Sequence, residues 1–354
     1  MKHTTAVATV STFLLLIALL GVSCTRYTFD EEPEQSVGAL IGFNNAIRTD
    51  TMFLPSEPRE VFYNNDLRWF NPNKPLQITL TSQRTIDLKL YSPIAVSDVD
   101  VYATVVHFPG VEFYLAHFDR LYPFMAAEFR FPLVHEPVVV MTTDRKIVEL
   151  PAMPQLSPGD IEFRIDCSDP FLQKTAAITS NWMVCFSPFQ ADQGHAYWRH
   201  MTPELCRHGV ALALNMAYMF STPEFDRRLD SYNGQLTDNN GNPINLDELR
   251  ERLRTHPGLT LGRVEGVGGL GGGRTYGLAD YCYKQVYWDW EADPLANPHT
   301  YVRQAMFHEY GHCLGYSHES TMTYGDKWTV LCAECFVALG AEGRLPVCSK
   351  NDVN

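Results

Sequence analysis

The chain has no excess of basic residues and no long hydrophobic run. Its 28 basic residues are outnumbered by 41 acidic ones, the formal net charge is −13, and the basic residues form no stripe. This argues against nucleic acid and anionic membrane surfaces as partners. The apolar run Phe13–Leu20 is too short to span a bilayer as a stable helix. The 354 residues, 45% hydrophobic and 19% charged, are typical of a globular protein and sufficient for two domains.

Three ligand-binding motifs are incomplete. The loop 238–242 is rich in oxygen atoms, but its glycine comes too early for a calcium loop and no glutamate closes it, so an ordinary turn is favoured. The stretch 266–273 contains G-x-G-x-x-G, but a strand is expected after it rather than a helix, which favours a flexible rim loop over a dinucleotide site. Cys332 and Cys335 have no second pair at zinc-finger spacing, which argues against a zinc site there.

The N-terminus has the pattern of an export signal. Lys2 precedes the apolar run, and small residues precede Cys24. We expect residues 1–24 to be a lipoprotein-type signal peptide with Cys24 lipidated, although the leucine usual before the cysteine stands one residue early, at Leu20. Cleavage after Ser23 by an ordinary signal peptidase is the alternative. The protein is thus expected at the outer membrane or cell surface, or else periplasmic or secreted, with the lipid as its only membrane contact.

Eight cysteines remain besides Cys24, an even number in an exported protein. Up to four disulfides are expected, and their connectivity cannot be derived. Cys332 and Cys335 would share one side of a helix, so each is expected to pair elsewhere, while a buried free thiol is the alternative for Cys313.

The stretch 308–318, HEYGHCLGYSH, has the spacing of a catalytic zinc site. His308 and His312 are one turn apart on an expected helix, so both rings leave the same face. Gly315 lets the chain turn back and bring His318 as a third ligand, which leaves a fourth position open. Glu309 is placed to take a proton from water rather than to bind the ion.

This motif resembles the metzincin metallopeptidases, whose signature H-E-x-x-H-x-x-G-x-x-H it matches at every specified position. The resemblance implies a methionine turn, for which Ser320–Tyr324 is the candidate, with Met322 beneath the ligands. Tyr324 corresponds to a tyrosine that helps to stabilise the oxyanion in some members of the family. Only three residues separate His318 from Met322, fewer than in the family pattern, so an ordinary core position for Met322 stays open.

An α+β fold is expected: an N-terminal antiparallel β-sandwich, then a metzincin-like catalytic domain with a small mixed sheet, a backing helix and the zinc-binding helix. Residues 25–74 would be a tether and leading segment, 75–175 the accessory sandwich and 176–354 the catalytic domain. In the last we expect strands at 181–188 and 258–264, one or two more within 275–290, and helices at 202–220, 298–314 and 326–339. Asn245 would begin a short helix. Tyr276–Tyr283 is the candidate substrate-binding edge strand.

The resemblance implies a zinc-dependent endopeptidase that acts on extracellular or surface proteins or peptides. Zinc on His308, His312 and His318 would polarise the scissile carbonyl, and Glu309 would be the base. Two alternatives stay open: a surface binding or adhesion lipoprotein with a vestigial metal site, and a zinc hydrolase of a non-peptide bond. The sequence does not indicate an oligomeric state.

Overall fold

A computed structural model describes residues 38–285, 301–325 and 327–353 of the chain. All of them belong to the second of the two units into which the chain divides, Pro33–Asn354. The fold is α+β, as the sequence predicts. In this part of the chain, no helix is long and apolar enough to cross a membrane.

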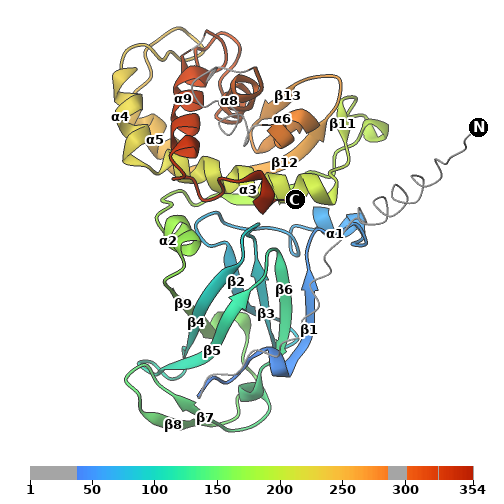
Figure 1. Ribbon diagram of the computed structural model, residues 1–354, viewed down its shortest axis with the longest axis vertical. Coiled ribbons are helices and arrows are strands. Elements are labelled where there is room, and N and C mark those ends of the chain that lie inside the picture. Colours follow the sequence, from blue (N-terminus) through green and yellow to red (C-terminus); the bar gives the residue numbers. More distant parts are fainter. Residues whose placement is uncertain (1–37, 286–300, 326, 354) are drawn as a thin grey trace, which may run out of the picture. The chain divides into compact units, whose positions relative to one another are not determined.

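Two antiparallel sheets form the first half of the described chain (Figure 1). One contains, in order, β1 (Ala46–Thr51), β6 (Met125–Arg130), β3 (Thr85–Leu90) and β2 (Leu76–Leu80), and the other contains β5 (Glu112–Leu121), β4 (Val96–Val105) and β9 (Ile161–Cys167). Alternate side chains of β3 are buried, and the rings of Phe118 and Phe129, one from each sheet, have centroids 5.7 Å apart. The expected β-sandwich is therefore confirmed. A hairpin of β7 (Val138–Met141) and β8 (Ile147–Leu150) extends it.

The sandwich includes a strand from before residue 75. β1 pairs with β6 from Arg48 opposite Glu128 to Thr51 opposite Met125, within the segment expected to be a tether and leading segment. None of the side chains of β1 is buried. The strand therefore does not show the alternation of apolar buried residues with polar exposed residues by which a sequence predicts a strand.

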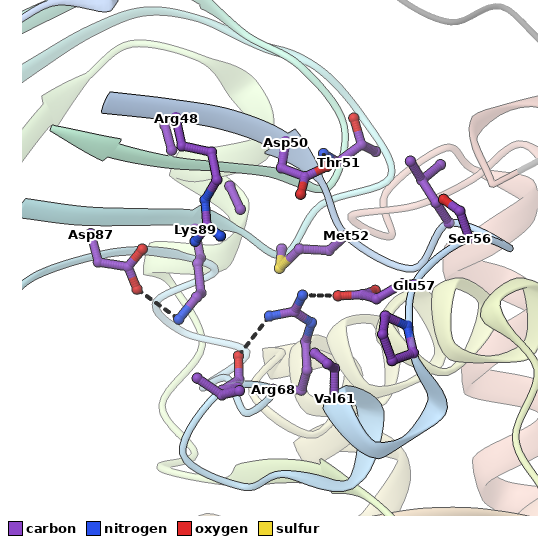
Figure 2. A pocket seen from close by; sticks show the side chains of 15 residues that line it. Arg48, Asp50, Thr51, Met52, Ser56, Glu57, Val61, Arg68, Asp87 and Lys89 are labelled. Carbon is purple, nitrogen blue, oxygen red and sulfur yellow. Dashed lines mark hydrogen bonds and ion pairs between the residues drawn. The ribbon is translucent and has the colours of Figure 1, made fainter. Parts of the chain in front are cut away.

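The segment between β1 and β2 contains α1 (Arg59–Tyr63) and lies over one end of the sheet. A cavity of about 390 Å³ is lined by this segment and by β1, β3 and β6 (Figure 2). Lys89 pairs with Asp87 at 2.7 Å, and Arg68 pairs with Glu57. These two cations of the cavity are therefore neutralised within the chain.

A mixed sheet and a buried helix open the second half, after α2 (Pro170–Ala176). The helix expected at 202–220 is confirmed as α3 (Pro203–Phe220), and the hydroxyl of Thr202 caps it by accepting from the Leu205 N–H at 3.2 Å. The expected strands near 181–188 and at 258–264 are also confirmed. In the sheet, β10 (Met183–Phe186), β12 (Gly258–Val264) and β14 (Thr275–Ala279) run parallel, while β13 (Gly269–Gly272) pairs antiparallel with β14 and β11 (Trp198–Arg199) with β12.

The expected edge strand at 276–283 is wrong. β14 lies between β12 and β13 and is almost wholly buried, and the chain then forms α6 (Asp280–Gln285). Among the described residues β13 ends the sheet on this side and β10 on the other, and β13 belongs to the glycine-rich stretch expected to be a flexible loop. Glycines present no side-chain pattern, so periodicity could not predict this strand.

The helices expected to begin at Asn245 and to span 298–314 and 326–339 lie near those positions. Asn245 caps α5 (Leu246–Thr255) as expected, Asp238 forms an ordinary turn with Asn240 and Asn242, and α4 (Pro223–Ser231) was not predicted. The expected starts of the last two helices, at residues 298 and 326, lie outside the described residues. α8 (Tyr301–Cys313) ends one residue before the expected end at 314, and α9 (Trp328–Ala341) runs two residues past the expected end at Leu339.

The eight cysteines from Cys167 onward are free thiols, so the expected disulfides are absent from the described residues. Cys332 and Cys335 are fully buried on α9, where they act as small apolar side chains of the core.

Candidate metal centre

Helix α8 presents His308 and His312 on the face opposite its buried stripe. Their ring centroids are 4.8 Å apart, as expected one turn apart on a helix. The stripe consists of buried apolar residues: Met306, Phe307, Tyr310, Cys313 and, directly after the helix, Leu314. α8 lies beside β13 and α9 (Figure 1).

A tight turn after α8 brings His318 to the same place. Gly315 has φ +84°, a left-handed conformation that glycine adopts without strain. The Gly315 N–H donates to the His312 carbonyl at 2.9 Å. The Nε2 of His318 then lies 3.0 Å from the Nε2 of His312, so the three predicted ligands are brought together.

Backbone carbonyls orient two of the rings. The Nδ1 of His308 lies 2.6 Å from the Thr323 oxygen, and the Nδ1 of His312 lies 2.7 Å from the Tyr316 oxygen. Because a carbonyl can only accept, each Nδ1 carries the proton and each Nε2 keeps a lone pair. Burial also lowers the pKa of both histidines, which favours the neutral form that binds metals.

The converging lone pairs fit a metal ion. The Nε2 atoms of His308 and His312 are 3.2 Å apart, and ligand nitrogens of all three histidines lie within 4.8 Å of one another. Zinc–nitrogen distances of about 2.0–2.1 Å in a tetrahedron place ligand nitrogens about 3.3 Å apart. Lone pairs this close repel unless a cation lies between them. His308, His312 and His318 could therefore hold a metal ion.

Glu309 lies next to the triad without belonging to it. Its side chain is buried under β13, and only 8% of the residue is exposed. Burial raises the pKa of Glu309 to about 7, while a hydrogen bond from the Gly271 backbone opposes this shift. The carboxylate is thus desolvated.

The segment 320–324 packs directly against α8. Met322 is fully buried, and a Cβ built on Gly311 would lie 2.2 Å from the Met322 carbonyl oxygen. Tyr324 is exposed, and its ring centroid lies 4.6 Å from that of His318 and 5.2 Å from that of His308. The structure therefore brings Tyr324 to the triad and buries Met322.

A cavity of about 340 Å³ opens beside the triad and includes His308 and Glu309 in its walls. The other walls come from β13 and the residue before it, from α8, from the segment after Met322 and from α9: Gly268, Gly269, Gln304, Ala305, Thr323, Tyr324, Gly325 and Thr329. It could admit a group that reaches the metal site.

Sequence patterns missed the groups that support the site. The carbonyls of Tyr316 and Thr323 and the Gly271 amide belong to the backbone, which every residue has, so no residue type indicates them. Arg252 on α5 donates to the Leu314 carbonyl and, at 2.8 Å, to the Tyr316 hydroxyl. It thereby holds the turn that brings His318 to the triad.

Comparisons with protein-family models, with curated proteins and with solved structures find no match. The geometry of this site is therefore the basis for assigning a function.

Proposed function

We propose that the protein is a zinc-dependent endopeptidase of metzincin type that cleaves extracellular or surface proteins. The observation that carries the proposal is the convergence of His308, His312 and His318, with two Nε2–Nε2 distances of 3.2 and 3.0 Å. Nitrogen ligands at these separations suit tetrahedral zinc. The adjacent carboxylate of Glu309, outside the ligand set, suits a hydrolase.

Each residue then has a defined role. A bound zinc ion supplies Lewis-acid chemistry that makes water more acidic and a carbonyl more electrophilic. The Glu309 carboxylate accepts a proton from the attacking water and returns it to the leaving amine. The Tyr324 hydroxyl donates to the oxyanion as charge develops. An extended peptide pairs with the outer edge of β13, which has no neighbouring strand among the described residues and replaces 276–283 as the candidate strand.

The test is cleavage of a mixed peptide library by the purified mature protein, together with its metal content. We expect one zinc per chain and hydrolysis. Glu309→Gln should retain zinc and lose turnover by about a hundredfold or more, because an amide cannot take the proton. Glu319→Gln, an exposed carboxylate in the neighbouring turn, is the matched control and should behave as the parent. A Glu309→Gln rate near that of the parent would contradict the mechanism, and ester or glycan cleavage without peptide cleavage would favour a non-peptide hydrolase.

The proposal includes export, with Cys24 as a lipid-anchored N-terminus. In cells fed an alkyne fatty acid, the chain should become labelled and Cys24→Ser should abolish the label, while Cys167→Ser should keep it. Label that persists in Cys24→Ser would exclude this anchor.

A further inference from the structure

The glycine-rich strand β13 lies unusually close to Glu309. A Cβ built on Gly269 would be 2.4 Å from the Glu309 Cγ, and one built on Gly271 would be 2.1 Å from the Glu309 carbonyl oxygen. Contacts this short are far inside van der Waals separation. The strand can therefore lie here only because both positions lack a side chain.

The close approach is confined to one face of the strand. Gly269 and Gly271 are two residues apart, so they face the same side of β13. A Cβ on Gly272 would have nothing within 4 Å. None of these three glycines has a left-handed φ, so alanine at each position would be limited by space alone.

The backbone of the same strand also acts on the carboxylate. The Gly271 backbone lowers the pKa of Glu309 and so opposes the effect of burial, and the Glu309 side chain is buried beneath the strand. Packing against Gly269 restricts the rotamers that the Glu309 side chain can adopt.

We propose that β13 is a positioning element for Glu309, in which Gly271 donates its N–H to the carboxylate and Gly269 leaves the space that the side chain fills. The catalytic consequence rests on the proposed function, because it requires Glu309 to be the base. A proton acceptor held in one orientation needs no rearrangement as water attacks, and displacements near 1 Å can lower rates by about a hundredfold.

The contact between the Gly271 N–H and the Glu309 carboxylate can be tested by NMR of the mature protein labelled with ¹⁵N-glycine. This test needs no measurement of enzyme activity. In Glu309→Ala, the Gly271 amide proton should move upfield and exchange faster with solvent, because its charged acceptor is gone. The amide of Gly159, an exposed residue far from Glu309 in the sequence, should not change. An unmoved Gly271 resonance would overturn the proposal.

The effect of this positioning on catalysis is tested with Gly269→Ala and the matched control Gly272→Ala. The three atoms nearest to a methyl group at 269 all belong to the Glu309 side chain, so we expect the fold and the zinc content to survive while the carboxylate shifts. We expect kcat to fall about ten- to a hundredfold with KM within about twofold, the pattern of lost transition-state stabilisation, whereas Gly272→Ala should match the parent.

The outcomes separate the two proposals. Equal kinetics of Gly269→Ala and Gly272→Ala would overturn the positioning role while leaving the peptidase intact, as would a fall in kcat that follows loss of zinc. An inactive parent would refute the peptidase, and the Gly271 resonance would still decide whether β13 holds Glu309.

Discussion

The Thr323 carbonyl accepts a hydrogen bond from the Nδ1 of His308 at 2.6 Å, so the residue after Met322 orients the first histidine of the triad. The Thr323 hydroxyl also donates to the Ser317 carbonyl at 2.6 Å. These two bonds connect α8, the turn that carries His318 and the segment 320–324. The three-residue connection between His318 and Met322 is therefore long enough to close around the site. Metal-binding histidines are commonly oriented by such carbonyls.

Loss of His312 should weaken metal binding more than loss of either other ligand, because its Nε2 lies close to the Nε2 of both His308 and His318. We expect His312→Ala to weaken zinc binding by more than about a hundredfold, because loss of a partner outside the ligand set alone weakens it ten- to a hundredfold. Elemental analysis after dialysis against a weak chelator measures this. His135→Ala, an exposed histidine of the sandwich, should keep its zinc. Undiminished zinc in His312→Ala would refute the assignment.

The sequence predicts those parts in which side chains define the geometry. The spacing from His308 to His318 identifies the triad, and Thr202 and Asn245 identify two helix starts, because ligands and caps need particular side chains. It fails at β13, whose glycines carry no pattern, and at β1, whose side chains remain partly or fully exposed. The prediction of an edge strand at Tyr276–Tyr283 is also wrong, because the local sequence does not reveal that β13 pairs with the far side of β14. Strand order depends on tertiary contacts, which periodicity does not report.

Replacement of Tyr324 tests whether a side chain close to the triad takes part in catalysis. Its ring lies 4.6 Å from His318 between centroids and is exposed, so the side chain is not needed to fill the core. If its hydroxyl stabilises the oxyanion, Tyr324→Phe should lower kcat by roughly ten- to a thousandfold with little change in KM. The midpoint of thermal unfolding should stay near that of the parent. An unchanged kcat in the folded, zinc-loaded variant would remove Tyr324 from the catalytic residues.

His256 connects the start of β12 to the end of α8. Its Nε2–H donates to the Cys313 carbonyl at 3.2 Å, and its Nδ1 accepts from the Gly258 N–H at 3.2 Å, so the folded protein needs the neutral ring. Burial lowers the pKa of His256 below its usual value of about 6.5, and the unfolded chain therefore takes up the proton first as the pH falls. The stability that this ring contributes is complete above about pH 6.5 and is lost as the pH falls through the folded pKa.

We therefore expect the urea midpoint of the metal-free protein, measured with a chelator present, to fall between pH 7 and pH 5. His256→Gln should show a shallower fall over the same range, because its amide can donate to Cys313 but cannot be protonated. At pH 7 this variant should be less stable than the parent by about 1 kcal/mol, since the bond from the buried Gly258 N–H is lost. His135→Gln, exposed and distant in sequence, should follow the parent. Equal pH slopes for His256→Gln and the parent would show that other groups account for the acid sensitivity.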